Sequence, residues 1–527
     1  MLEVRCQMVA NKKMTIAALL VVLGVSLSIA SGWISPAELT AGCSSYNGSG
    51  IPYTGADVLV QAWNYFPKFH FVPHASFQAV ADIRMGASYS NTILDQPNLG
   101  VFLDNIIEFG IWRFDTCVDE CEPPINWGFN NEEEFPEEYD QFIDGLNANG
   151  ITVNYMLHFW DKTGHLYGEE LSTPRFQTEE QIQDFLNYTR VVVSQHRGLF
   201  QYYTIWTEPD ACPGIKCIEP EDYINLVRRT VPVIHEEDPL AMVAIAPNVL
   251  FYAQEYLAAI LESDIMTMVD VVQWHGLYNY MPIDPLHGDY YNQYPAIIEG
   301  IRQTAAAHGF DGQYWATEIT YCSEEFPFCT PPDMLDLIPE TDKQAAKYNA
   351  RTIVMHLGMD MGISMGTLRY DNPRIAPLSQ RAMTNLYKVL VGTRPINLAV
   401  AIERAPPNTM TNAFELPNGD ILFALWTHGQ AVDDDPGVRT RLTFPGLSAQ
   451  QVLAIDVLNG FEQELIIETW TGSLVIRDLF IRDYPLILHI TNPSSGSPLV
   501  IVLISGLLIG IPIIGLSVYF IRRRRIR

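Results

Sequence analysis

A regular alternation of strand-like and helix-like segments between about residues 79 and 392 is the feature that most constrains the fold of this chain. Short apolar runs are separated by longer stretches with helical periodicity, which is the pattern of parallel strands joined by crossover helices. Eight such runs occur, and eight strands close a (β/α)8 barrel. The sequence therefore predicts an α/β fold with a (β/α)8 TIM barrel over residues 75–394. The expected strands are Val80–Ala87, Ile111–Phe114, Ile151–His158, Tyr202–Trp206, Met242–Ile245, Val269–Trp274, Gln313–Thr317 and Gly362–Tyr370.

Between these runs, several segments have the length and the periodicity of barrel helices. Each is long enough to carry the chain from the end of one strand back to the start of the next. The expected helices are Glu134–Asn149, Thr178–His196, Pro220–Ile234, Pro295–His308 and Asp342–Met359.

After residue 392 the sequence changes to short strands and turns. Phe414–Leu416 and Ile421–Trp426 flank the residues Pro417–Asp420, which contain Asn-Gly. Asn-Gly supplies the positive φ angles that a tight hairpin turn requires. We expect a small all-β sandwich as an accessory domain over residues 395–491.

The first 30 residues have the order of a secretory signal. Lys12 and Lys13 precede the apolar run Ile16–Ala30, which ends in small residues. This run is short for a membrane span, so we expect a cleaved signal peptide over residues 1–30, with an uncleaved signal anchor as the alternative. Residues 31–74 then form an N-terminal extension.

The other end of the chain is typical of a membrane anchor. Leu499–Ile521 contains no charged residue and is followed at once by the basic run Arg522–Arg525. We expect a linker over residues 492–498, a transmembrane helix over 499–521 and a cytoplasmic tail over 522–527. The protein would then be a single-pass protein of the cell membrane with an extracellular catalytic domain, and the membrane would be a partner through this helix.

Composition excludes other classes of protein. The chain has 527 residues, of which 48% are hydrophobic and 18% charged, so it is too apolar to be disordered and long enough for a large domain plus a smaller one. Its 61 acidic and 32 basic residues give a net charge of -29. Such a field repels a phosphate backbone, so we expect no nucleic-acid partner.

Six cysteines occur as close pairs, which suits an oxidising compartment. We interpret the pairs as short-loop disulfides, and Cys43 as a free thiol or an unpaired structural cysteine. The alternative is a four-sulfur metal site made by the first two pairs, but neither pair has the C-x-x-C spacing. The pairs are Cys117 with Cys121, Cys212 with Cys217, and Cys322 with Cys329.

Two carboxylates stand at strand ends, where the active sites of barrels lie. Glu208 follows the fourth expected strand, and Glu318 follows the seventh. These two strands face each other across an eight-stranded barrel, so the two side chains can approach over its mouth. A single glutamate at a strand end is more often only solvated. Two opposed carboxylates about 5 to 5.5 Å apart are what retaining glycoside hydrolysis requires.

Three motifs around these glutamates resemble the clan A glycoside hydrolases, particularly cellulase-like and β-xylosidase-like members such as families 5 and 39. They are Trp-x-Glu-Pro at Trp206–Pro209, Asp-Val-Val-x-x-His-x-x-Tyr at Asp270–Tyr278 and Trp-x-Thr-Glu at Trp315–Glu318. The resemblance covers roughly residues 75–392, and the β-sandwich is similar to the accessory domain of several of these families. It implies that Glu208 is the catalytic acid/base and Glu318 the catalytic nucleophile, with no cofactor and no metal.

Further residues are expected to bind substrate or to position the carboxylates. Arg113 ends the second expected strand and resembles the clan arginine beside the nucleophile, where a positive charge lowers a carboxyl pKa. His158 ends the third strand, and His275 and Tyr278 follow the sixth, where they would hydrogen-bond to sugar or to the carboxylates. A structural hydrogen bond explains each of them singly as well.

Four tryptophans, Trp127, Trp160, Trp274 and Trp315, are expected to offer stacking surfaces to sugar rings, although a tryptophan lies more often in a core. The sequence also departs from the clan pattern. Most members have Asn before the acid/base glutamate, to bind the sugar 2-hydroxyl, and this chain has Thr207. Residues 368–370 are Leu-Arg-Tyr where many relatives have a tryptophan.

The sequence thus predicts a retaining glycoside hydrolase that cleaves β-linked oligo- or polysaccharides at the cell surface by double displacement. Two alternatives stay open. One is a non-catalytic carbohydrate-binding surface protein on a barrel scaffold, which the missing Asn and Trp favour. The other is a transglycosylase that remodels envelope glycans.

Overall fold

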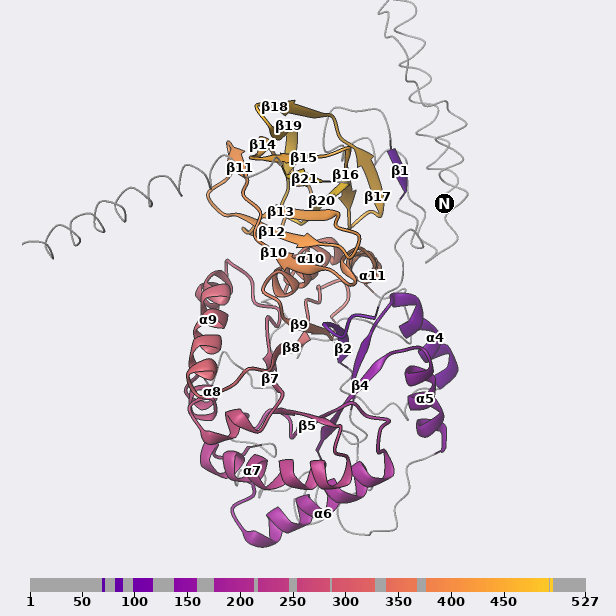
Figure 1. The fold of residues 1–527 in the computed structure, drawn as a ribbon, viewed down its shortest axis with the longest axis vertical. Coiled ribbons are helices and arrows are strands. Elements are labelled where there is room, and N and C mark those ends of the chain that lie inside the picture. Colours follow the sequence, from indigo (N-terminus) through magenta and orange to yellow (C-terminus); the bar gives the residue numbers. More distant parts are fainter. Residues whose placement is uncertain are drawn as a thin grey trace, which may run out of the picture. The chain divides into compact units, whose positions relative to one another are not determined.

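The computed structural model contains a closed barrel of eight parallel strands, in the order β2 to β9 with β9 paired back to β2 (Figure 1). Each strand coincides with or overlaps one of the eight apolar runs in the sequence, which confirms the predicted barrel. The strands are β2 (Met85–Ser88), β3 (Arg113–Thr116), β4 (Thr152–Leu157), β5 (Tyr202–Ile205), β6 (Met242–Ile245), β7 (Val271–His275), β8 (Gln313–Ile319) and β9 (Gly362–Met365).

The structure describes residues 69–71, 81–88, 98–116, 137–158, 175–212, 217–245, 254–284, 287–327, 338–366, 376–491 and 493–495. The predicted signal peptide, transmembrane helix and cytoplasmic tail lie outside these residues, as does most of the linker. Within the described ranges, no helix combines the length and the apolar character needed to cross a bilayer.

Helices cover the outside of the barrel strands (Figure 1). Thr178 caps the start of α6 with a reciprocal capping box to Gln181, which explains why the predicted boundary there is accurate. The sequence predicted a helix over Pro295–His308; helix α9 instead begins at Gly288 and continues through Pro295. The helices are α4 (Leu99–Phe109), α5 (Glu137–Ala148), α6 (Glu179–Gln195), α7 (Pro220–Glu237), α8 (Gln254–Leu261), α9 (Gly288–Ala307), α10 (Asp342–Gly358) and α11 (Pro377–Leu390).

The C-terminal part is all β, as predicted, with two main antiparallel sheets. The seven-stranded sheet has the order β1-β17-β16-β20-β13-β12-β10, and the four-stranded sheet has the order β11-β14-β19-β18. Phe423 and Phe444 pack between the two sheets with ring centroids 5.0 Å apart. The strands are β10 (Arg394–Ile396), β11 (Ala401–Glu403), β12 (Thr409–Glu415), β13 (Ile421–Thr427), β14 (Val438–Phe444), β15 (Leu447–Ser448), β16 (Gln451–Asp456), β17 (Phe461–Glu464), β18 (Ile467–Trp470), β19 (Ser473–Ile481), β20 (Leu486–Thr491) and β21 (Ser494–Ser495).

Two details of these sheets bear on the sequence predictions. The predicted hairpin is present as β12 paired with β13, and Gly419 in its turn has a φ of 85°. Strand β1 (Phe69–Phe71) pairs with β17, so a short piece of the N-terminal extension forms an edge strand of the C-terminal sheet. The sequence did not predict that pairing, because three residues are too few to show a period.

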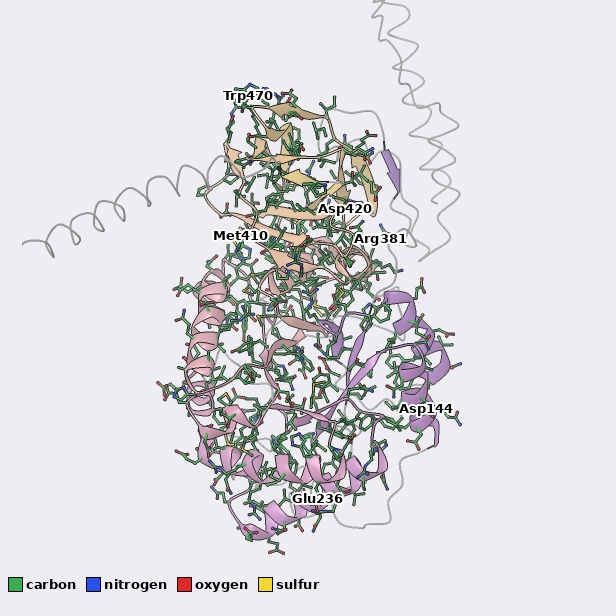
Figure 2. All side chains as sticks on the ribbon, viewed as in Figure 1. Asp144, Glu236, Arg381, Met410, Asp420 and Trp470 are labelled. Atoms are coloured by element: carbon green, nitrogen blue, oxygen red, sulfur yellow. A yellow bond between two sulfur atoms is a disulfide. The ribbon has the colours of Figure 1, made fainter. Side chains whose placement is uncertain are left out.

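Helix α10 joins the barrel to the C-terminal sheets. Residues on every face of this helix are buried, because the barrel covers one side and the sheets cover the other. Lys347 forms an ion pair with Asp483 at 2.7 Å, and Arg351 donates to the backbone carbonyl of Asp483 at 2.7 Å. Figure 2 labels Met410 of β12 and Arg381 of α11 at this junction.

Candidate active site

The fold brings together two glutamates that lie far apart in the sequence. Glu208 follows the end of β5, and Glu318 is the penultimate residue of β8. Both approach His275, the last residue of β7, whose Nε2 is 3.2 Å from Glu208 Oε1 and 3.4 Å from Glu318 Oε2. One oxygen from each carboxylate and one imidazole nitrogen all lie within 4.8 Å of one another. Each glutamate side chain is 25% exposed, so the pair is open to a ligand at the carboxyl ends of the strands.

Tyr278 lies in the electrostatic field of the same pair. Burial, followed by the negative charges of Glu318 and Glu208, raises the pKa of its phenol to about 12. The backbone of Tyr278 forms a bridge with Thr320, which ties the segment after β7 to the segment after β8. The tyrosine therefore stays protonated near neutral pH and offers a hydrogen-bond donor close to both carboxylates.

The backbone at both glutamates is strained. Glu208 has a φ of 45° and Glu318 a φ of 52°, and Trp206 has a φ of 64°. Non-glycine residues rarely adopt this left-handed region, and such strain concentrates at functional sites. The pairing of β8 with β9 also shifts register between Ala316 and Ile319, and a bulge of this kind changes the direction of a side chain. The direction of each carboxylate is thus set by backbone distortion.

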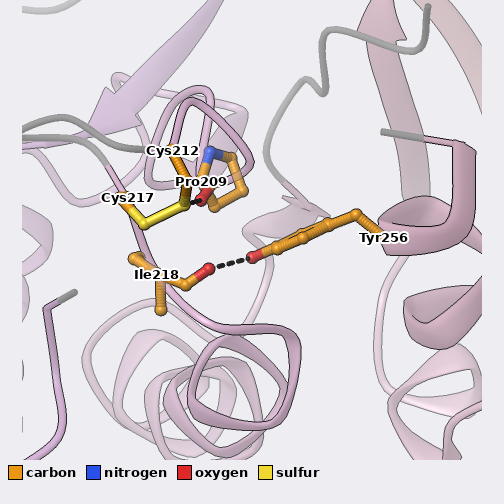
Figure 3. Close-up of a disulfide and its surroundings, with 5 residues drawn as sticks. All are labelled: Pro209, Cys212, Cys217, Ile218 and Tyr256. Atoms are coloured by element: carbon orange, nitrogen blue, oxygen red, sulfur yellow. Dashed lines mark hydrogen bonds between the residues drawn. A yellow bond between two sulfur atoms is a disulfide. The ribbon is translucent and has the colours of Figure 1, made fainter. Parts of the chain in front are cut away.

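The segment that follows Glu208 is held from outside the barrel (Figure 3). Cys212 and Cys217 form a disulfide, which confirms one predicted pair. The backbone nitrogen of Ile218 donates to the carbonyl of Pro209 at 2.8 Å, and Tyr256 of α8 donates to the carbonyl of Ile218 at 2.9 Å. The chain immediately after the glutamate therefore cannot swing away freely.

The other predicted disulfides are described only in part. Cys322 is disulfide-bonded, and its backbone nitrogen donates to Asn279 Oδ1 at 2.9 Å. Its expected partner Cys329, and the expected pair of Cys117 with Cys121, lie outside the described residues.

Glu318 is supported from inside the barrel. Its backbone nitrogen donates to Ser88 Oγ at 3.4 Å, and Ser88 in turn donates to Asp115 Oδ2 at 3.3 Å. Asp115 pairs with Arg113 at 3.1 Å and also accepts hydrogen bonds from Asn154 and Ser364. Because the side chains of Asp115 and Arg113 are almost completely buried, this polar network has few alternatives to its present arrangement.

Two predicted substrate-binding residues lie in the barrel interior. Arg113 was predicted to end its strand, but it begins β3, and its observed partners are Asp115, Ser364 and the carbonyl of Ile83. Trp315 has no exposed surface, and the Arg113 guanidinium lies 3.9 Å from its ring centroid. Neither side chain offers a surface to a sugar. A motif in the sequence does not show at which level of the barrel a side chain points inward, so the depth of these two residues could not be predicted, and their part in binding or in supporting the carboxylates stays a prediction.

Two of the remaining predicted residues, His158 and Thr207, adjoin Trp206, which lies two residues before Glu208. His158 directly follows β4 and packs edge-on against Trp206 with ring centroids 4.7 Å apart. It is fully buried, as is Trp206. Thr207 is 2% exposed, between that tryptophan and the glutamate. Trp160 lies outside the described residues. His158 thus stabilises the tryptophan before the glutamate.

Sequence reasoning missed Ser88 and Asp115. Asp115 stands two residues after Arg113 in a strand, so the two side chains point to the same face. An Arg-x-Asp pair inside an otherwise buried strand is therefore a signal that could have been read. Ser88 had no comparable signal, because it lies one residue beyond the predicted end of its strand.

Glu208, His275 and Glu318 are also the described residues that could hold a metal ion, since they offer two carboxylate oxygens and one imidazole nitrogen. Within the same cluster, the imidazole can equally donate a hydrogen bond to a carboxylate. The sequence predicted no metal site, and the two possibilities make different predictions for metal removal.

Comparisons with known proteins give a consistent fold. No family model matches the chain, and no curated protein matches it by sequence. Solved structures do match. A family 39 glycoside hydrolase from Bacteroides cellulosilyticus WH2 is similar with a TM-score of 0.54 and 16% identity, over 78% of this chain and 81% of that one.

Two further solved structures agree. A GH30 endoxylanase from Clostridium papyrosolvens C71 is similar with a TM-score of 0.53 and 14% identity, over 80% of this chain and 99% of that one. A glucosidase from Croceicoccus marinus is similar with a TM-score of 0.50 and 11% identity, over 80% of this chain and 98% of that one. At this level of identity a likeness establishes the fold alone, and the fold of this chain is similar to that of these glycoside hydrolases.

Proposed function

We propose that this chain is a retaining glycoside hydrolase. The observation that carries the proposal is the approach of Glu208 and Glu318 to one imidazole nitrogen, with the three groups within 4.8 Å of one another. Retaining enzymes hold their two carboxyl groups about 5 to 5.5 Å apart, whereas inverting enzymes need about 6.5 to 9.5 Å to admit a water molecule. The short approach supports a retaining mechanism.

The reaction would proceed in two steps. Glu318 attacks the anomeric carbon while Glu208 protonates the glycosidic oxygen, which leaves with the aglycone. The resulting glycosyl-enzyme is then hydrolysed by a water molecule, from which Glu208 takes a proton, so Glu208 returns to its acid form and Glu318 to its carboxylate. These roles follow the clan resemblance, in which the fourth-strand glutamate is the acid/base. Tyr278, whose phenol stays protonated in the field of both glutamates, offers a hydrogen-bond donor to the substrate or to a carboxylate.

The proposed substrates are β-linked oligo- or polysaccharides. The clan resemblance of the motifs supports this class, and one of the fold neighbours is described as an endoxylanase. We also propose that the enzyme acts at the cell surface, because the sequence has the pattern of a secretory signal at one end and of a membrane anchor at the other.

The test uses the full-length chain with aryl β-glycosides and with xylan, mannan and β-glucan. We expect turnover by the wild type, and a loss of about four orders of magnitude in Glu318→Ala. Glu324→Ala is the matched control, because Glu324 is an exposed glutamate on the segment that follows β8, and it should retain wild-type activity. Azide should restore turnover of activated aryl glycosides in Glu318→Ala and in Glu208→Ala, and the glycosyl azides formed by the two variants should have opposite anomeric configurations.

The product distinguishes the two roles. In Glu318→Ala, azide replaces the missing nucleophile and should give a glycosyl azide of inverted configuration. In Glu208→Ala, azide attacks the glycosyl-enzyme and should give retained configuration. Wild-type turnover in Glu318→Ala would contradict the assignment, and glycan binding without any turnover would identify a binding protein instead.

A further inference from the structure

Trp470 differs from the other tryptophans in the described part of the chain. Its surface is 62% exposed, whereas Trp206, Trp274, Trp315 and Trp426 are fully buried. A large aromatic ring is normally withdrawn from water, and an exposed ring on a folded surface often marks a binding site. Figure 2 shows Trp470 at the rim of the four-stranded sheet, where β18 ends.

The ring is held by rigid backbone. Trp470 pairs with Ser473 across the β18–β19 hairpin, and the two residues between them, Thr471 and Gly472, have φ angles of 48° and 74°. Positive φ at both central positions defines the tight type I′ hairpin turn. Because such a turn has little freedom, a ligand that stacks on Trp470 does not have to order a loop first.

Polar groups lie beside the ring on the same face. Side chains alternate along a strand, so Glu468 and Trp470 point to the same side of β18. Glu468 forms an ion pair with Arg477 of the neighbouring strand at 2.8 Å, and both are about half exposed. The exposed indole is therefore flanked by hydrogen-bonding groups that point to solvent.

The charge of this sheet indicates the class of ligand. All six charged residues of β11, β14, β18 and β19 belong to three ion pairs, in a chain whose net charge is -29. A balanced surface favours neither an anionic membrane nor a strongly charged peptide. A neutral sugar ring fits, because it has one face of C–H groups for the indole and hydroxyls for the ion-paired side chains. The pairs are Arg439 with Asp478, Arg441 with Glu403, and Glu468 with Arg477.

We propose that the face of the four-stranded sheet around Trp470 is a second, non-catalytic binding site for a neutral polysaccharide. This surface belongs to the sheet that does not contain β12 or β13, so it is separate from the junction with α10. The site keeps the enzyme on an insoluble polymer while the barrel acts on it. Only the choice of polymer rests on the proposed function.

The test measures binding separately from catalysis. The full-length chain with Glu318→Ala, which does not turn over substrate, is incubated with insoluble xylan, mannan, cellulose and β-glucan. Adding Trp470→Ala should raise the dissociation constant for at least one polymer about tenfold. Trp470→Tyr should retain part of the affinity. Leu240→Ala, which removes a 90% exposed apolar side chain from the barrel, should change nothing.

A second measurement uses the active chain. Trp470→Ala should slow hydrolysis of the insoluble polymer several-fold and leave kcat/KM on a soluble aryl glycoside unchanged. Unchanged binding of every polymer by Trp470→Ala would overturn the proposal, as would an equal loss in Leu240→Ala. If Trp470→Ala instead abolished only self-association, the surface would be a protein contact. Absence of turnover in the wild type would count against the proposed function alone, because the binding measurement does not depend on it.

Discussion

The two glutamates of the candidate active site, Glu208 and Glu318, are positioned by different physical means. The chain after Glu208 is fixed by a covalent bond, the Cys212–Cys217 disulfide, and by backbone hydrogen bonds at the surface of the barrel. Glu318 is fixed by a buried polar network that runs through Ser88 and Asp115. Both glutamates have strained backbone, so each needs support, but the support for one is outside the barrel and for the other inside.

Because the two supports differ, their loss should affect two properties to different degrees: the positions of the glutamate side chains and the global stability of the fold. A loop outside the barrel can lose its cross-link while the core stays packed. A buried carboxylate cannot lose its partner in the same way, because the remaining charge stays in a low-dielectric interior. Damage to the Glu318 support should therefore destabilise the fold strongly, and damage to the Glu208 support should destabilise it less and also affect the chemistry of one step.

The largest effect is expected from Asp115→Ala. The substitution leaves the fully buried Arg113 without its carboxylate partner, and breaking a buried pair costs about 3–5 kcal/mol. Urea unfolding of the full chain should show this loss. The matched control is Asp264→Ala, which removes an exposed pair with Arg228 and should leave the free energy of unfolding nearly unchanged. Equal losses of unfolding free energy in Asp115→Ala and Asp264→Ala would contradict the expected difference between a buried and an exposed ion pair.

The second prediction concerns the outer support. The double substitution Cys212→Ser with Cys217→Ser should lower the free energy of unfolding by about 2 kcal/mol, because the disulfide closes a short loop. Its effect on rate should depend on the leaving group. Hydrolysis of substrates that need protonation by Glu208 should slow about tenfold, because the acid is held less firmly in position. Hydrolysis of activated aryl glycosides should change little. If both substrate types slow equally, the disulfide does not act through Glu208.

The sequence was sufficient to predict the barrel because strand period, helix period and loop length all agreed. The proximity of Glu208 and Glu318 also followed from their places in the sequence, since the residues at the carboxyl ends of barrel strands meet over the mouth. Helix α10 shows why the junction between the barrel and the C-terminal sheets could not be predicted from the sequence. It is buried on every face, so its sequence carries no amphipathic signal for the junction with the β-sheets.

Inside the site, the unpredicted features depend on depth and on backbone angles. Arg113 and Trp315 have the residue types that sugar sites use, but they lie in the barrel interior. The φ angles of Glu208 and Glu318 leave no trace in residue identity, because neither is a glycine. The sequence shows which residues meet at the strand ends and cannot show how each is held there.

Tyr278 lies in the electrostatic field of both glutamates, so its removal tests the two together. Tyr278→Phe deletes a donor close to both carboxylates, and we expect a several-fold loss of kcat/KM, corresponding to about 1 kcal/mol. The pKa of this phenol is raised to about 12 from an ordinary value of 10.0, so the native state holds the proton more tightly than the unfolded state. Its contribution to stability is complete below about pH 10 and is lost as the pH rises towards 12.

The measurement is a comparison of wild-type and Tyr278→Phe unfolding across pH. The difference in unfolding free energy should be constant from pH 6 to pH 9 and should shrink above pH 10. A difference that changes near pH 6 would show that Tyr278 acts through another titrating group.

The smallest effect is expected from metal removal. This prediction concerns His275, whose imidazole approaches both glutamates. His275 Nε2 lies 3.2 Å from Glu208 and 3.4 Å from Glu318, within reach of both carboxylates. If this nitrogen carries its hydrogen, the imidazole orients both carboxylates and leaves a lone pair of Glu318 free to attack the sugar. A divalent cation between the same three groups would occupy those lone pairs and suppress the attack. Treatment with EDTA should therefore change kcat/KM less than about twofold, because two carboxylates suffice for double displacement. Added Zn²⁺ should inhibit. If EDTA abolished the activity and a divalent cation restored it, His275 would be a metal ligand. The two glutamates would then be held by one shared cation.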